Sequence, residues 1–214
     1  MLNLSFPDLI RAIIIIVISL TVHEFGHSLV AIRLGDETPR REGRLTLNPI
    51  AHIDLIGFIM LIVAGFGWAK PVHIDTSALK KPQRDEILIS LAGPAANIVL
   101  ALLSGLAAWA VVITATSGSG LAPAAFSILT QAAVINVSLA VFNMLPIPPL
   151  DGSHLITTWL VKVNPTAAMT YFRYGSWALL GLILVERVLN VDILPVGRLT
   201  VAIVTAFYRL LGMV

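Results

Sequence analysis

Three side chains that suit metal-dependent hydrolysis lie within five positions, His-Glu-Phe-Gly-His at 23–27. His23 and His27 are four residues apart, so in a helix their imidazoles share one face and can bind one zinc ion. Glu24 follows the first histidine, where it can reach a zinc-bound water without being a ligand. Zinc lowers the pKa of that water, and Glu24 would accept its proton during attack on a carbonyl carbon. The pattern predicts one Zn2+ per chain and a hydrolytic role.

A catalytic zinc needs a third protein ligand and one open position. Asp151 is the strongest candidate, because it lies in the segment Pro-Ile-Pro-Pro-Leu-Asp-Gly at 146–152. The prolines forbid a regular helix there, and Gly152 permits a sharp turn that can direct the carboxylate toward the metal. The alternative is that Asp151 caps a helix that begins near Ser153. Weaker ligand candidates lie in loops: His154, Asp54, His52 and His73.

The composition predicts that these residues are held by membrane helices. The chain has 214 residues, of which 57% are hydrophobic and only 12% charged, about half the charged share of a soluble domain. We therefore expect an all-α polytopic membrane protein in a lipid bilayer, with residues 1–214 forming a single domain. The net charge of +2 gives no reason to expect a nucleic-acid partner. The absence of cysteine excludes disulfides and Cys-ligated metals.

Hydropathy predicts about five to six transmembrane helices. The stretch 9–20 has no basic segment before it and no small-residue cleavage pattern after it, so we interpret it as a retained span rather than a signal peptide. The candidate spans are 8–34, 86–114, 124–145, 171–189 and 198–213, with a shorter apolar stretch at 155–163.

Loop charges predict the topology. The loops 33–44 and 70–84 each carry four Arg or Lys residues, whereas the loop 115–123 carries none. Positive loops stay on the cytoplasmic side, so both basic loops should lie on one side of the membrane. The apolar segment 55–69 between them must then re-enter instead of crossing. This topology places Asp151 in the same half of the bilayer as His23.

Ionisable residues inside a span favour a functional interpretation of 23–27. Each charged residue there costs at least about 2.5–3.5 kcal/mol, and such residues are functional by default. A purely structural polar network is the less favoured alternative.

Four motifs together resemble the site-2 protease family of intramembrane zinc metalloproteases. They are HEFGH (23–27), GWAKPV (67–72), AGPAAN (92–97) and FNMLPIPPLDG (142–152), and the resemblance covers most of residues 20–155. It implies that His23, His27 and Asp151 bind zinc and that Glu24 is catalytic. It also implies a membrane-protein substrate that is cut in a transmembrane helix, and a prokaryotic cell (inner) membrane location. No PDZ module lies between the spans.

Two asparagines are candidates for substrate binding. Asn143 maps onto the family's asparagine before the Leu-Asp-Gly turn, and an amide there can hold a substrate backbone or a developing oxyanion. The alternative for both Asn143 and Asn97 is hydrogen bonding between helices, which is the favoured interpretation for Asn97. Short β-strands near the active site are expected at 44–47 and 71–75, where a free edge could capture an unwound substrate segment.

Two other functional classes compete with the protease interpretation. The His and Asp residues could form the ion path of a transporter or metal channel. However, no internal repeat is visible, and a transporter has no need for Glu24 beside two histidines. A proteolytically inactive membrane scaffold is the second alternative, but the sequence contains all four groups that catalysis requires.

Overall fold

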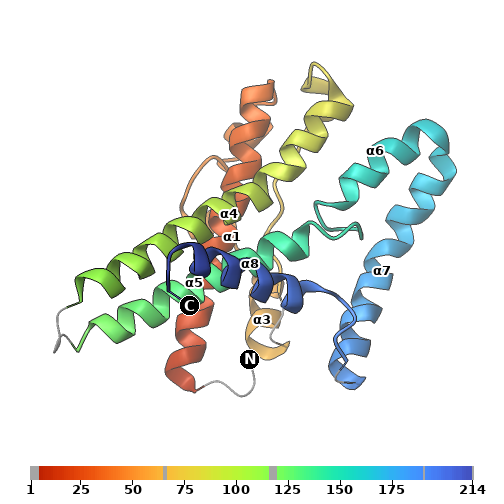
Figure 1. The fold of residues 1–214 in the computed structure, drawn as a ribbon. Coiled ribbons are helices and arrows are strands. Elements are labelled where there is room, and N and C mark those ends of the chain that lie inside the picture. Colours follow the sequence, from red (N-terminus) through yellow and green to blue (C-terminus); the bar gives the residue numbers. More distant parts are fainter. Residues whose placement is uncertain (1–4, 65–66, 116–119, 190, 214) are drawn as a thin grey trace.

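The computed structural model describes residues 5–64, 67–115, 120–189 and 191–213, and these residues are predominantly helical. Figure 1 shows how the helices are arranged. They are α1 (Phe6–Leu34), α2 (Thr38–Arg41), α3 (Leu55–Ala64), α4 (Pro82–Thr114), α5 (Ala122–Asn143), α6 (Ser153–Val163), α7 (Pro165–Leu189) and α8 (Val196–Leu210), with 3-10 turns η1 (Pro49–Ala51) and η2 (Thr76–Ala78).

The long helix α1 carries the 23–27 motif. Its first turn is capped by Ser5, whose hydroxyl accepts the backbone N–H of Asp8. It ends at Gly35, whose φ of 111° is a left-handed conformation that favours glycine. The 29 residues between these caps span about 44 Å at 1.5 Å per residue, enough to cross a bilayer.

The helices α1, α4 and α5 form the group that holds the motif. Figure 1 shows α4 and α5 running side by side as a hairpin, with α1 crossing them. Small residues allow the close approach of α1 and α4: a Cβ on Gly26 would lie 2.8 Å from the backbone oxygen of Ala92 and 3.0 Å from Ala96 Cβ. Gly26 lies inside the 23–27 motif, so this packing brings the histidines against α4.

The segments before and after α3 lie next to each other, so the chain enters and leaves this helix from the same direction. Ile53, before α3, forms an antiparallel bridge with Ala69, after it. Lys70 also donates its backbone N–H to the oxygen of His52 at 2.8 Å. α3 has only 10 residues, about 15 Å, and its two flanks are hydrogen-bonded to each other, an arrangement consistent with the re-entrant segment predicted from the loop charges.

The C-terminal helices complete the molecule. Figure 1 shows the α6–α7 pair at one edge of the molecule and α8 lying across α5. α8 is fixed by Ser138, which donates its hydroxyl to Thr200 Oγ1 at 3.2 Å, and by Phe207, which lies against Gly105 of α4.

The all-helical prediction is confirmed, but two of its details are wrong. Four helices of the described chain are long and apolar enough to cross a membrane, α1, α4, α5 and α7, instead of five to six. The stretch predicted at 198–213 forms α8, which has only 15 residues, about 22 Å in length.

The short strands predicted at 44–47 and 71–75 are absent from the described residues, where the only β pairing is the isolated bridge before and after α3. The segment 71–75 has no regular secondary structure, and two of its backbone N–H groups donate to side chains. Val72 donates to Glu24 and Asp75 donates to Asp36, so neither N–H is left to pair with a neighbouring strand. In the other segment, Arg44 is buried and donates its guanidinium to the oxygen of Ala51.

Candidate metal centre

The two histidines of α1 present one nitrogen each to a common point. Both rings are buried, with 4% of His23 and 8% of His27 exposed. Their Nε2 atoms lie 3.1 Å apart. This is the geometry that the i, i+4 spacing predicts for one helical face.

Asp151 reaches the same point from the turn between α5 and α6. Gly152 donates its backbone N–H to the oxygen of Asn143 at 2.7 Å, which folds the turn back onto the end of α5. A Cβ on Gly152 would lie 2.5 Å from the carbonyl carbon of Met144, so only glycine fits there. The turn places Asp151 Oδ2 at 3.1 Å from His23 Nε2 and Oδ1 at 3.4 Å from His27 Nε2.

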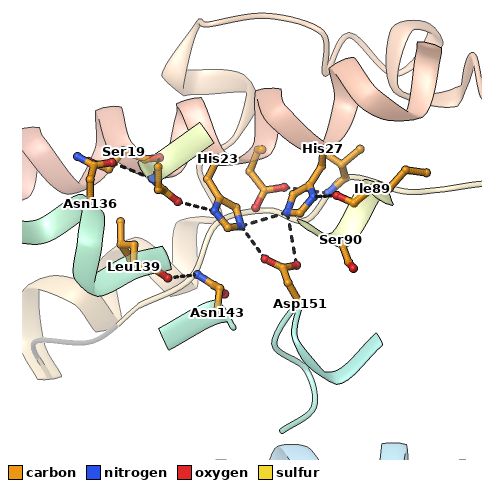
Figure 2. Close-up of polar contacts among 12 residues, drawn as sticks. Ser19, His23, His27, Ile89, Ser90, Asn136, Leu139, Asn143 and Asp151 are labelled. Carbon is orange, nitrogen blue, oxygen red and sulfur yellow. Dashed lines mark hydrogen bonds and ion pairs between the residues drawn. The ribbon is translucent and has the colours of Figure 1, made fainter. Parts of the chain in front are cut away.

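The three donor groups form a triangle of the size that zinc requires (Figure 2). Ligand atoms at about 2.0–2.1 Å from a tetrahedral zinc ion are separated by about 3.3–3.4 Å. The two Nε2 atoms lie 3.1 Å apart, His23 Nε2 lies 3.1 Å from Asp151 Oδ2, and His27 Nε2 lies 3.4 Å from the other carboxylate oxygen, Oδ1. The Oδ2 atom of Asp151 is buried and has no hydrogen-bond partner among the described residues. A cation would satisfy this oxygen.

The hydrogen-bond partner of the Nδ1 atom in each ring indicates which ring nitrogen carries the hydrogen. His27 Nδ1 lies 2.7 Å from the backbone oxygen of Ile89, and His23 Nδ1 lies 2.6 Å from Asn97 Oδ1. Both partners are acceptors, so each Nδ1 carries a hydrogen, and in the neutral imidazole each Nε2 then presents a lone pair. Two lone pairs and a carboxylate that converge in a buried site repel one another unless a cation lies between them. The donor set therefore fits Zn2+.

Gly93 leaves space for an ion at this point. A Cβ at position 93 would overlap His27 Nε2 and lie 2.6 Å from His23 Nε2. Gly93 belongs to the segment AGPAAN of α4, which packs on α1. A side chain of any size at this position would occupy the volume into which the two nitrogens point.

Glu24 is oriented by the extended segment that follows α3. Its Oε2 accepts the backbone N–H of Val72 at 3.2 Å, and only 9% of the residue is exposed. The segment is anchored further along, where Asp75 donates its backbone N–H to Asp36 Oδ2 at 2.8 Å. Hydrogen bonds from the side chain and backbone of Ser77 hold the pKa of the Asp75 carboxyl below its usual value. The carboxylate of Glu24 is thus positioned beside the histidines by a backbone donor.

The two predicted substrate-binding asparagines have different surroundings. Asn143 lies at the end of α5, is partly exposed, and donates its amide to the oxygen of Leu139 in its own helix at 3.0 Å. Asn97 is fully buried and contacts His23. The structure therefore brings Asn97, but not Asn143, into hydrogen-bond contact with a candidate ligand.

The weaker ligand candidates lie outside the metal centre. His154 pairs with Glu86 Oε1 at 2.9 Å, and His73 pairs with Glu42 Oε1 at 3.1 Å. His52 is buried against the oxygen of Thr46, and Asp54 accepts the backbone N–H of Gly57. The only described group of three or more His, Cys, Asp or Glu side chains that could hold a metal is His23, His27 and Asp151.

Sequence reasoning missed four groups of this site. Gly93 was not singled out as a site residue, and the backbone groups of Ile89 and Val72 carry no signal in the side-chain pattern. Asn136 was missed as well. Its position was detectable, because a polar amide in the middle of an apolar span needs a partner inside the protein.

Comparison with known proteins agrees with this geometry. The profile of peptidase family M50 matches residues 11–116 and 105–183. No solved structure matches this chain at a significant level.

Three related proteins carry zinc metalloprotease names. "Putative zinc metalloprotease YwhC" of Bacillus subtilis is 42% identical over 163 residues, which cover 74% of this chain and 72% of that protein. "Putative zinc metalloprotease Rip2" of Mycolicibacterium smegmatis is 41% identical over 143 residues, 63% of this chain and 51% of that protein. "Putative zinc metalloprotease MJ0611" of Methanocaldococcus jannaschii is 30% identical over 194 residues, 86% of this chain and 84% of that protein.

Proposed function

Because this chain belongs to peptidase family M50, whose profile covers most of its length, we propose that it is a zinc endopeptidase that cleaves transmembrane segments of other membrane proteins. We propose that His23, His27 and Asp151 hold the zinc ion and that Glu24 is the general base. The convergence of three donor groups at separations close to those of zinc ligands, next to an oriented carboxylate, supports this proposal most directly.

The proposed zinc ligands, Glu24 and Val72 have separate roles in the proposed reaction. A zinc ion held by the three ligands would polarise the scissile carbonyl and make water acidic enough to attack it. Glu24 removes a proton from the attacking water and delivers it to the amine nitrogen that leaves. The N–H of Val72 keeps one carboxylate oxygen of Glu24 in place, so the carboxylate does not have to be ordered during the reaction.

The depth of the site supports a membrane-embedded substrate. His23 lies about 16 Å along the axis of α1 from its last residue, Leu34. In a helix that crosses a hydrocarbon core of about 30 Å, this position is well inside the bilayer. A peptide bond must therefore be presented at membrane depth, which points to the transmembrane helices of multi-pass or single-span proteins. The cell membrane of a prokaryote is the proposed location.

The decisive experiment compares wild type with Glu24→Gln in the purified full-length chain. Both should hold about one zinc per chain. Cleavage of a panel of single-span membrane proteins in proteoliposomes should fall about 10²–10⁴-fold in the variant, because only the proton acceptor is lost. Glu37→Gln is a matched control, since Glu37 is exposed and pairs with Arg40, three residues further along the chain.

Two results would contradict the proposal. Wild-type protein that does not bind zinc would remove the metal centre. Glu24→Gln protein that cleaves as fast as wild type would remove the role of Glu24, even with zinc in place.

A further inference from the structure

A chain of buried amides leads away from the metal centre. Asn97 of α4 is fully buried between α1 and α5. Its Oδ1 lies 2.6 Å from His23 Nδ1, and its Nδ2 donates to the backbone oxygen of Ser19 at 3.1 Å and to Asn136 Oδ1 at 2.8 Å. Both N–H bonds of the amide are thus directed at acceptors, so none is left for a substrate backbone.

Asn136 of α5 continues this network and is only 1% exposed. Its Nδ2 donates to the backbone oxygen of Ala132 and to Ser19 Oγ, both at 2.9 Å. Ser19 in turn donates its hydroxyl to the backbone oxygen of Ile15 at 2.7 Å. Figure 2 shows Asn136 and Ser19 on the side of His23 away from Asp151.

Backbone carbonyls determine the direction of every bond in this network, because they can only accept. The carbonyl of Ala132 requires the NH2 group of Asn136, which turns the oxygen of Asn136 toward Asn97. That oxygen and the carbonyl of Ser19 both require the NH2 group of Asn97. The remaining oxygen of Asn97 then faces His23.

We propose that Asn97, held in this orientation by Ser19 and Asn136, sets the tautomer of His23 and is a positioning residue of the metal centre. The oxygen of Asn97 keeps the hydrogen on Nδ1 and leaves the Nε2 lone pair free for the metal. If the amide were reversed, its NH2 group would face Nδ1, and the hydrogen would move to Nε2, where it blocks coordination. The proposal rests on the proposed zinc site and replaces substrate binding as the role of Asn97.

The two histidines differ in the group that holds their Nδ1 atom. His27 Nδ1 is held directly by the backbone oxygen of Ile89, which no substitution at positions 97 or 136 alters. Changes in the amide network therefore act on one ligand of three. They should weaken metal binding without abolishing it.

The test measures Zn2+ affinity of the purified full-length chain in detergent, by competition with a chromogenic chelator. Asn97→Leu, which removes the acceptor at similar volume, should weaken affinity about 10–100-fold, the usual range for partners of a ligating histidine. Asn97→Asp should recover part of this loss, because a carboxyl oxygen again accepts from Nδ1, although it offers no NH2 group to Ser19 and Asn136. Asn136→Leu should have a smaller effect, since Ser19 still holds Asn97.

A matched control separates positioning from helix packing. Ser138 lies on α5 two residues beyond Asn136 and also makes a partly buried hydrogen bond to another helix, with Thr200. Ser138→Ala should lower thermal stability without changing Zn2+ affinity. Co2+-substituted protein gives a second readout, because Asn97→Leu should change the visible absorption bands of the metal and Ser138→Ala should not.

The outcomes are distinguishable. Wild-type protein without zinc would refute the proposed function itself. Wild-type protein with zinc, and folded Asn97→Leu protein that binds it within about twofold of wild type, would overturn only the role of Asn97. If Asn97→Leu does not fold, Asn136→Leu decides the matter: affinity reduced several-fold supports the network, and unchanged affinity overturns it.

Discussion

Gly93 lies on the face of α4 that packs against both histidines. The Cβ of any other residue would overlap His27 Nε2 and crowd His23 Nε2 at 2.6 Å. Neither nitrogen can retreat easily, because each ring is also held at its Nδ1 atom. At the scale of single residues, the metal centre therefore depends on the absence of a side chain as much as on its ligands.

This dependence gives a prediction for Gly93→Ala. In a helix interior, alanine is favoured over glycine by about 0.5–1 kcal/mol, so propensity alone would stabilise the variant. We nevertheless expect zinc affinity to fall at least about 10-fold, the scale on which misplaced ligands act. Zinc affinity and thermal stability of the purified apoprotein would be measured together.

Gly181→Ala is the control, because a Cβ at Gly181 of α7 meets no atom within 4 Å. It should leave zinc binding unchanged. Normal zinc affinity in Gly93→Ala protein would show that zinc binding does not require the absence of a side chain at position 93.

At the scale of elements, the turn that carries Asp151 is held by two helices. From α5, the backbone oxygen of Asn143 accepts the N–H of Gly152. From α7, Tyr171 donates its hydroxyl to the backbone oxygen of Pro146 at 2.8 Å. Gly175, one turn further along α7, lies so close to Pro148 that a Cβ would approach its Cδ to 2.5 Å. Although α7 contributes no candidate metal ligand, its packing positions Asp151, the third candidate ligand.

The variant Gly175→Leu should therefore weaken zinc binding from a distance. Overpacking of a close contact costs about 1–3 kcal/mol, which corresponds to about 5–150-fold in affinity if the Asp151 turn moves to relieve it. The measurement is Zn2+ affinity, compared with Gly181→Leu on the same helix as the control for added bulk. Equal affinity of Gly175→Leu and wild type would mean that the turn does not depend on α7.

At the scale of the whole molecule, the two basic loops lie together. Asp75 of the second loop donates its backbone N–H to Asp36 of the first, and His73 pairs with Glu42 across the same contact. The antiparallel bridge of Ile53 and Ala69 returns the chain to the side from which α3 entered. From these contacts we predict that residues 33–54 and 70–84 share one side of the membrane.

Cysteine labelling tests this topology cleanly, because the chain has no cysteine of its own. Exposed single cysteines introduced at Arg40 and Lys80 should react with a membrane-impermeant maleimide from the cytoplasmic side only. A cysteine at Leu121, which is 83% exposed at the start of α5, should react from the opposite side only. Labelling of Arg40→Cys and Lys80→Cys from opposite sides would mean that residues 55–69 cross the bilayer.

Much of the site was predictable because its signals are local. His23, Glu24 and His27 share a helical face through spacing alone, and their cost inside an apolar span marks them as functional. Asp151 was detectable because prolines and Gly152 break the helix around it. The long helices α1, α4 and α5 followed from apolar length.

Other features depended on which segments meet in space. The stretch 71–75 has the residue pattern of a strand. However, two of its backbone N–H groups donate to the side chains of Glu24 and Asp36 instead of to a neighbouring strand. The stretch 198–213 is apolar enough to suggest a transmembrane span. Its helix is short, however, and it lies across α5, where Ser138 donates a hydrogen bond to Thr200. Hydropathy measures how apolar a segment is, and it does not say whether lipid or another helix covers it.

By itself, the amino-acid sequence determined that this protein is a helical membrane protein with a His-Glu-His zinc motif and a distant aspartate. Tertiary structure alone decided that Gly93 packs against both candidate histidine ligands, that α7 contacts the Asp151 turn, and that the amide of Asn97 faces a histidine. The physical reason is the range of the interactions. Helical periodicity and hydrophobicity act between neighbours along the chain, whereas close packing and hydrogen-bond direction depend on partners tens of residues away.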